Sequence, residues 1–220
     1  MCGIAGRYNS KSHARPDRET IAAMCDLLAH RGPDGEGVVI DGPVGLGHRR
    51  LAIIDLSEAG REPMQTADGC LTIVYNGEVY NYRQLRVELE RRGHTFQSQT
   101  DTEVVLLAYR EFGPECLGRL RGMFAFAIWD RQDRSLFLAR DRLGQKPLCY
   151  IEDRDGIAFA SEPKAFLADP SFTPRPNLEG ISHYLSYQYV PTPLSGFAGV
   201  RKLPPAHYMI VKDGRIQIER

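Results

Sequence analysis

A cysteine stands directly after the initiator methionine of this chain. Methionine is normally removed when a small residue follows it, so we expect Cys2 to carry both a thiol and a free α-amine. An α-amine ordinarily titrates at about 7.7–8.0 and a thiol at about 8.5, which allows proton exchange between them near neutral pH. Cys2 is therefore a candidate nucleophile with its own amine as base. The alternative interpretation is a small residue near a chain end.

Two charged residues could bind the ends of an amino acid. Arg50 precedes the apolar run 51–54, and its guanidinium could bind a carboxylate through two hydrogen bonds. Asp101 begins a predicted helix, where its carboxylate could bind an ammonium group or simply cap the helix. For Arg50 the alternative is a solvated surface arginine.

Asn76 and Gly77 follow the apolar run 71–75, which predicts a strand. An Asn-Gly pair is typical of a turn. The same pair could supply an amide and a backbone N–H to an oxyanion hole, where each donor contributes about 2.7–4 kcal/mol. A thiolate, an oxyanion hole and sites for a carboxylate and an ammonium together suit hydrolysis of the side-chain amide of a free α-amino acid.

The composition excludes several classes of protein. The 220 residues include 28 basic and 28 acidic ones, so no positive charge surplus indicates nucleic acid or an anionic membrane. No apolar run approaches the ~18 residues that span a bilayer, and no apolar leader precedes Cys2. The five cysteines have no metal-binding spacing, which favours reduced thiols and a cytoplasmic location.

The elements that must position these residues alternate between short strands and helices. Apolar periodicity and turn signals predict helices over 16–30, 82–92, 101–111, 161–168 and 178–187. They predict strands over 3–9, 38–40, 44–46, 51–54, 71–75, 123–130, 136–139, 148–151, 157–160, 208–211 and 216–218. Most strands form hairpins, and no sustained βαβ alternation is present. The pattern favours an antiparallel-rich α+β fold with helices packed outside the sheets.

The composition changes near Asp169, because seven prolines lie in the last 52 residues. We therefore expect a domain over 2–168 and a Pro-rich connector with a hairpin over 169–220. Residues 140–142 (Arg-Asp-Arg) predict a buried ion-pair cluster that organises the core or a domain interface.

These motifs together resemble the class II glutamine amidotransferases, whose glutaminase domains are N-terminal-nucleophile hydrolases, and within them the asparagine synthetase branch. The resemblance rests on residues 2–6, 31–34, 48–55, 75–81, 100–103, 122–126, 139–148 and 160–165. It implies a four-layer αββα sandwich of two antiparallel sheets, which agrees with the α+β pattern.

The resemblance also implies roles for individual residues. Cys2 would attack the side-chain amide of L-glutamine and form a thioester, which water then hydrolyses to glutamate. Arg50 would hold the α-carboxylate, and Asn76 with Gly77 would form the oxyanion hole. The remaining pocket residues it implies are Leu51, Ile53 and Ile54 along the backbone of one wall, and Glu78 and Asp101 at the α-ammonium group.

Full members of this branch pass the ammonia to a C-terminal synthetase domain that uses ATP and Mg²⁺ to amidate aspartate to asparagine. The signature Ser-Gly-Gly-x-Asp-Ser of that domain does not occur in these residues. We therefore expect the glutaminase half, needing no metal or cofactor of its own, with L-glutamine and the synthetase domain as partners and a homodimer as a candidate assembly. Two alternatives stay open: a relative with a different ammonia acceptor, or a catalytically silent glutamine-binding or docking module.

Overall fold

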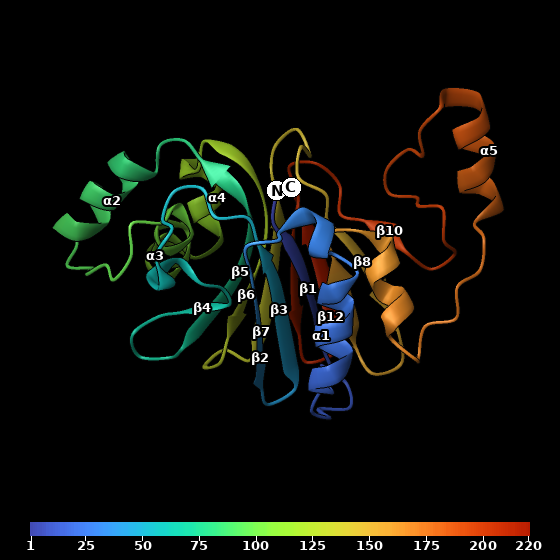
Figure 1. Cartoon of the computed structure of the whole chain (residues 1–220), viewed down its shortest axis with the longest axis horizontal. Helices are drawn as coiled ribbons and strands as arrows, with labels where there is room; N and C mark the ends of the chain where they lie inside the picture. The colour runs from blue at the N-terminus through green and yellow to red at the C-terminus, as the bar shows by residue number, and fades with distance from the viewer.

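Twelve strands form two six-stranded antiparallel sheets in the computed structural model, which describes all 220 residues (Figure 1). The first sheet has the order β10-β8-β9-β1-β3-β2 and the second β12-β11-β7-β6-β5-β4. The strands of the first sheet are β1 (Gly3–Tyr8), β2 (Gly35–Asp41), β3 (Val44–Arg50), β8 (Cys149–Glu152), β9 (Ile157–Ala160) and β10 (Arg201–Lys202). Those of the second are β4 (Met64–Gln65), β5 (Leu71–Val79), β6 (Gly122–Asp130), β7 (Ser135–Arg140), β11 (Tyr208–Lys212) and β12 (Arg215–Glu219).

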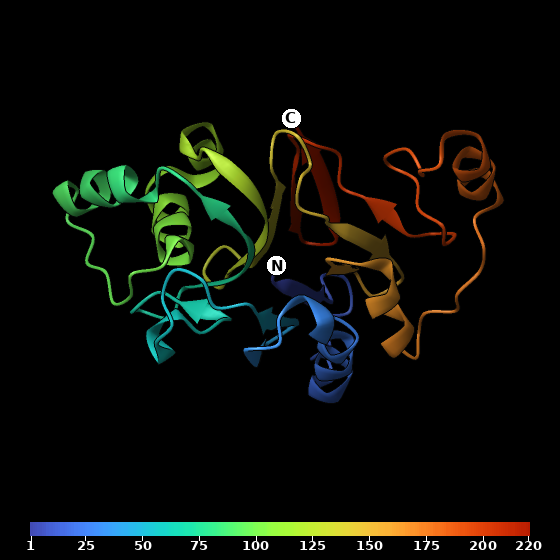
Figure 2. The same ribbon diagram turned by 45° about the horizontal axis from the view of Figure 1, so that its top comes forward.

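Helices cover the outer face of each sheet, so the molecule has four layers (Figures 1 and 2). The helix α1 (Arg18–Asp26) and the 3₁₀ helix η4 (Pro163–Ala168) pack on the first sheet. The helices α2 (Tyr82–Arg91), α3 (Asp101–Phe112) and α4 (Cys116–Arg119) lie on the side of the second sheet. This arrangement confirms the predicted αββα sandwich.

Three apolar clusters separate the four layers. The central cluster of 17 buried residues joins the facing sides of the two sheets, with Ile4 and Leu46 from one and Ala127 and Leu138 from the other. A cluster of 19 residues packs α2 and α3 on the second sheet, and one of 12 packs α1 and η4 on the first. Because strand side chains alternate between faces, each sheet can contribute to two clusters.

The predicted helices are found, but both ends of the first one differ from the predicted range 16–30. Helix α1 begins after Asp17, whose carboxylate caps it by accepting a hydrogen bond from the Thr20 N–H at 2.9 Å. It ends at Asp26 rather than at residue 30, and the 3₁₀ helix η1 (Ala29–Arg31) follows separately. The segment predicted as a helix over 161–168 is the 3₁₀ helix η4.

Two strand predictions next to the candidate site are wrong. Residues 51–54 form a loop rather than a strand, with Ile53 exposed. Asn76 and Gly77 do not turn the chain: β5 runs through them, in register with Ala125 and Phe124 of β6. Long pairing with β6 therefore overrides the local turn preference of the Asn-Gly pair.

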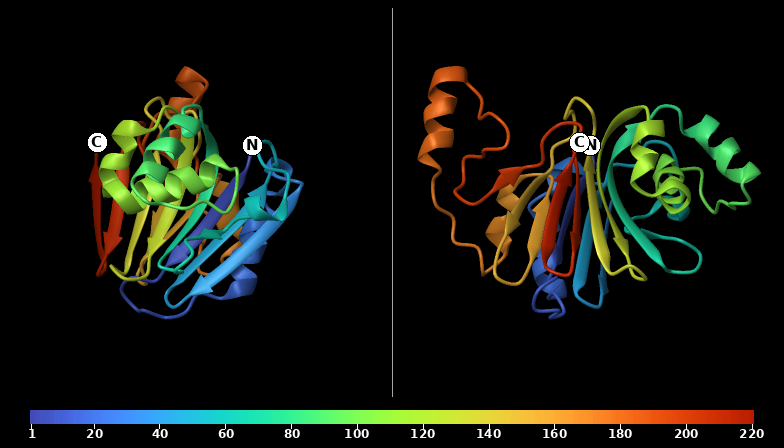
Figure 3. Two further views of the ribbon diagram at one scale, coloured as in Figure 1. Left: turned by 90° about the vertical axis from the view of Figure 1, so that its left-hand side faces the viewer. Right: turned by 180° about the vertical axis from the view of Figure 1, so that it is seen from behind.

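The last strands belong to the two sheets. β10 pairs with β8 in the first sheet, and the predicted hairpin β11–β12 extends the second sheet through β7. Only the helix α5 (Leu178–Tyr187) stands away from the four layers (Figure 3). A division of the chain at residue 169 stays a prediction, but the structure joins strands from both sides of it. No helix combines the length and the apolar character needed to cross a membrane.

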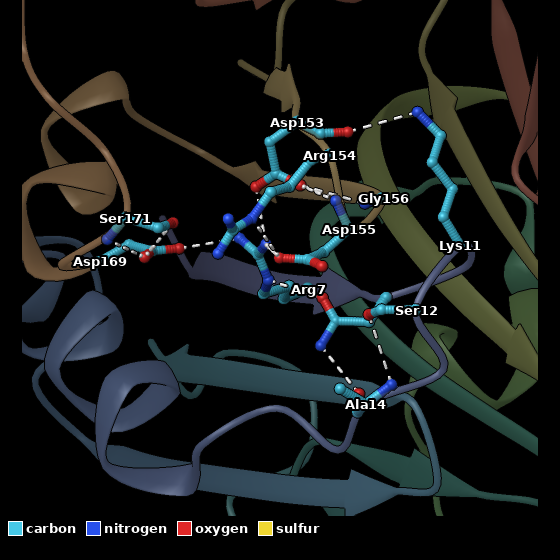
Figure 4. A network of polar contacts seen from close by, with 11 residues as sticks. Arg7, Lys11, Ser12, Ala14, Asp153, Arg154, Asp155, Gly156, Asp169 and Ser171 are labelled. Carbon is cyan, nitrogen blue, oxygen red and sulfur yellow. Dashed lines mark hydrogen bonds and ion pairs between the residues drawn. The ribbon is translucent and has the colours of Figure 1, made fainter.

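A buried arginine secures β1 within the first sheet (Figure 4). The Arg7 guanidinium contacts the carboxylates of Asp153 at 2.6 Å and Asp169 at 2.9 Å, and donates to the Asn9 side chain at 2.7 Å. Asp153 lies in the turn between β8 and β9, and Asp169 follows η4. The strand that follows Cys2 is thus tied to two distant segments of the chain.

Candidate active site

Every residue predicted for the site lines one cavity of about 170 Å³. It lies where the start of β1, the end of β3, β5 and the start of α3 meet. Its lining includes the nine predicted residues Cys2, Arg50, Leu51, Ile53, Ile54, Asn76, Gly77, Glu78 and Asp101. The structure therefore brings them together, while the individual roles stay predictions.

The Cys2 thiol contacts the loop after β3. The Leu51 N–H donates to Sγ at 3.4 Å, and Sγ lies 3.7 Å from the Leu51 carbonyl oxygen. Burial raises the pKa of the thiol to about 11, and the neighbouring Glu62 raises it further once that carboxyl is ionised. Cys2 therefore needs a base to ionise near neutral pH. The terminal amine belongs to Met1 in the printed chain, and burial lowers its pKa.

The Asn76 amide is buried in the wall of the cavity. Its side chain is 1% exposed, and neither Nδ2 nor Oδ1 has a hydrogen-bond partner. Buried amides in proteins are nearly always paired, so this one is available to a bound group. The next residue, Gly77, lies close to the backbone of β6: a Cβ at this position would lie 2.6 Å from the Met123 carbonyl oxygen. Only glycine fits at this position without moving β6.

The Arg50 guanidinium has no acidic partner. Its guanidinium donates to the Ser57 carbonyl at 3.0 Å and to the Asp55 carbonyl, and forms no ion pair. These bonds to its own loop hold the side chain in the cavity wall. A substrate carboxylate would give it the charged partner it lacks.

Two acidic residues line the same cavity. Asp101 is buried and accepts hydrogen bonds from the Tyr75 hydroxyl at 2.7 Å and the Val79 N–H at 2.9 Å. Burial raises the pKa of its carboxyl. The helix cap is Thr100 rather than Asp101, because the Thr100 side chain accepts from the first turn of α3. Glu78 is half-buried and has no ion-pair partner.

Sequence reasoning missed a buried pair beside Cys2. Glu62 accepts hydrogen bonds from the Tyr75 N–H at 2.6 Å and the Thr102 hydroxyl at 3.0 Å, and lies 3.4 Å from His48 Nε2. Burial raises the pKa of Glu62 to about 8 and lowers that of His48 to about 4. Both are therefore neutral near pH 7, and their contact is not an ion pair. A single glutamate between an arginine and a proline gives no sequence signal of this role.

The ion-pair cluster predicted for residues 140–142 is wrong. Arg140 donates instead to the carbonyl oxygens of Gly144, Lys146 and Leu203 at 2.6–2.8 Å. Asp141 accepts from backbone N–H groups of the turn that follows it. The motif shapes the connection between β7 and β8, and this connection places Lys146 in the cavity wall.

Comparison with known proteins places this chain in a family. A family described as "Glutamine amidotransferase domain" matches residues 1–220. The chain is 42% identical over 219 residues to "Asparagine synthetase [glutamine-hydrolyzing] 1" of Bacillus subtilis, covering 98% of this chain and 34% of the relative. It is 36% identical to "Putative asparagine synthetase [glutamine-hydrolyzing] 2" of Methanocaldococcus jannaschii, covering 100% of this chain and 46% of the relative. The chain thus spans about a third to a half of these relatives.

A solved structure shares the fold. The glutamine phosphoribosylpyrophosphate amidotransferase of B. subtilis superposes with a TM-score of 0.73 at 22% identity, over 100% of this chain and 49% of that one. At this identity the likeness shows the architecture, which is again the two-sheet α+β sandwich. The family match over residues 1–220 and the relatives above 30% identity show that the chain belongs to the class II glutamine amidotransferase domain family, as its motifs predict.

Proposed function

We propose that this domain hydrolyses L-glutamine to glutamate and ammonia through a thioester on Cys2. The observation that supports it most is the unpaired, buried Asn76 amide in the same cavity as the Cys2 thiol. A hydrogen-bond donor that is already positioned in a buried site stabilises the oxyanion that develops during the attack.

The proposed reaction begins when the α-amine of Cys2 takes the thiol proton. The thiolate attacks the side-chain amide carbon, and the oxyanion accepts hydrogen bonds from Asn76 Nδ2 and the Gly77 N–H. Collapse of this intermediate breaks the C–N bond, and the leaving ammonia takes the proton from the amine. Water then attacks the thioester, releases glutamate and restores the thiol.

The charges of the cavity suit the two ends of a free amino acid. Arg50 lacks an acidic partner and would bind the α-carboxylate. Glu78 and Asp101 would accept hydrogen bonds from the α-ammonium group. The backbone of Leu51, with Ile53 and Ile54, would form the wall between them.

We further propose that the ammonia serves a C-terminal synthetase domain that amidates aspartate with ATP and Mg²⁺. The names of the relatives and the share of their length that this chain spans support this destination. A relative with another acceptor is the alternative. The five unpaired cysteines support a cytoplasmic location.

Replacing Cys2 by alanine tests the proposal. We expect Cys2→Ala to release no glutamate while its circular dichroism spectrum matches that of the wild-type chain. A diazo-ketone analogue of glutamine should add once to the wild-type protein at Cys2, as intact mass would show. Folded wild-type protein that neither releases glutamate nor takes up the label would instead support the silent binding module.

A further inference from the structure

One edge of β5 has no strand partner where it borders the active-site cavity. Its pairing with the short strand β4 ends at Ile73. Backbone groups of successive residues in an antiparallel strand point to alternate edges. The N–H groups of Tyr75 and Val79 bond to side chains on this open edge rather than to β6, so the Gly77 N–H points to the same edge.

Two carboxyl groups bind the N–H groups on either side of Gly77. Glu62 accepts from the Tyr75 N–H at 2.6 Å, and Asp101 accepts from the Val79 N–H at 2.9 Å. None of the side-chain hydrogen bonds in the structure reaches the Gly77 N–H between them. The open edge of β5 therefore presents this donor to the cavity, at the position proposed for the oxyanion hole.

Tyr75 is held at both of its backbone groups. While Glu62 binds the N–H, the carbonyl oxygen accepts from His48 Nε2 at 3.1 Å. A carbonyl oxygen can only accept hydrogen bonds, so Nε2 carries the proton of this imidazole. The Glu62 carboxyl is fixed in turn by the Thr102 hydroxyl, which lies 3.0 Å from it. Tyr75, Glu62 and His48 are all buried, so bulk water does not compete for these bonds.

We propose that Glu62 and His48 are positioning residues that clamp the backbone of Tyr75. The clamp holds the next two residues, Asn76 and Gly77, where their donors meet the oxyanion. The inference rests on the proposed glutaminase function. The Asn76 amide has no hydrogen-bond partner of its own, so its placement depends on the backbone that carries it. Because a displacement of about 1 Å can cost ~10²-fold in rate, a fixed backbone at this point supports the reaction.

The first test compares Glu62→Met, Glu62→Gln and wild type by steady-state kinetics of glutamate release. Methionine is similar in size but cannot accept from the Tyr75 N–H, so we expect kcat to fall about 10- to 100-fold with little change in KM. The amide oxygen of E62Q can accept the same hydrogen bond, and this variant should keep most of the wild-type kcat. Glu58→Met, at an exposed glutamate, is the matched control and should leave both constants unchanged.

A second measurement separates positioning of the donors from general support of the cavity. The Cys2 thiol adds to the carbonyl carbon of the γ-aldehyde analogue of glutamine, its proton passes to the carbonyl oxygen, and that oxygen occupies the oxyanion site. L-norvaline offers only the α-carboxylate, the α-ammonium group and an apolar side chain. We expect E62M to weaken inhibition by the aldehyde about tenfold, and to leave inhibition by norvaline unchanged. Equal weakening of both inhibitors would overturn the proposal.

The second half of the clamp has its own variant. His48→Leu removes the donor to the Tyr75 carbonyl and should lower kcat with little change in KM, as E62M does. An unchanged kcat in folded H48L would remove His48 from the clamp. If E62M does not fold, Thr102→Val removes only the hydroxyl that fixes the Glu62 carboxyl, and the same split between kcat and KM is expected.

The outcomes distinguish this role from the proposed function. An unchanged kcat in folded E62M would overturn the role of Glu62, and so would an E62Q variant as slow as E62M. If the wild type is active, these results refute the clamp alone. A wild type that releases no glutamate would instead refute the proposed function itself.

Discussion

At the scale of single residues, Asn76 shows how an unfavourable feature marks a site. Its amide is buried without partners, which costs stability. Such a group is retained where a bound intermediate completes its hydrogen bonds.

Asn76→Ala should therefore lower kcat for glutamate release by about 10²–10³-fold, with a smaller change in KM, because the lost donor acts mainly in the transition state. Steady-state kinetics would show this split. An unchanged kcat in the folded variant would remove Asn76 from the oxyanion hole.

Glu62 should make the stability of the domain depend on pH. Burial raises its pKa to about 8, above the ordinary value of about 4.3, so the folded state keeps a proton that the unfolded chain releases. This stability is complete below about pH 4 and is lost as the pH rises through 8, at up to about 1.4 kcal/mol per pH unit. We expect Glu62→Gln to remove that loss.

Urea unfolding of the wild type and E62Q at pH 5, 7 and 9 would measure the effect, which should amount to a few kcal/mol over this range. The exposed Glu58 offers a matched control, since Glu58→Gln should follow the wild-type curve. A constant difference between wild type and E62Q at all three pH values would contradict the expectation.

The sequence predicted part of this site for a definite reason. Cys2, Arg50, Asn76 and Asp101 each belong to a local pattern that suggests its chemistry. Glu62 belongs to none, because its environment arises from burial and from neighbours far away in the chain.

At the scale of elements, hydrophobic periodicity predicted the helices and hairpins, because interactions between residues close in sequence determine them. Helices α2, α3 and α5 lie within a residue or so of the expected ranges. The hairpins at Asp41-Gly42 and Asp213-Gly214 form as expected. The errors fall where tertiary contacts decide: residues 51–54 remain a loop, and β5 continues through Asn76-Gly77.

The turn after β7 depends on one carboxylate. Asp141 accepts from the N–H groups of Phe124, Leu143, Gln145 and Lys146 at 2.9–3.2 Å. Asp141→Ala leaves these donors without their charged acceptor, and we expect the free energy of unfolding to fall by about 2–4 kcal/mol. Urea titration followed by tryptophan fluorescence would measure it.

A surface carboxylate provides the comparison. Asp133 pairs with Lys212 at the exposed β6–β7 turn, and such pairs contribute about 0–1 kcal/mol. Asp133→Ala should therefore change stability much less than D141A. Equal effects of the two substitutions would show that the turn does not depend on Asp141.

At the scale of the whole molecule, the two sheets are complete only when the last strands of the chain are present. Leu203, Met209 and Val211 are almost fully buried in the cluster between the sheets. A chain ending at residue 168 would lose β10, β11 and β12 and expose their partners on β7 and β8. We expect it to lack cooperative unfolding, whereas residues 1–220 unfold in one transition.

Near-ultraviolet circular dichroism and urea unfolding of the two chains would check this expectation. A cooperative transition in the 168-residue chain would show that the predicted boundary at residue 169 separates an independent domain. A Pro-rich composition alone could not decide this, because it does not show which strands the segment joins.

The central place of β1 leaves the residue before Cys2 exposed while the strand itself is buried. Met1 is 55% exposed, whereas Ile4 and Ala5 are fully buried and Arg7 is tied to distant segments. β9, which pairs with β1 on one side, is made about 150 residues later in synthesis. The pairing of β1 with β9 can therefore form only late in synthesis, and Met1 is accessible to an aminopeptidase before it forms and stays exposed afterwards.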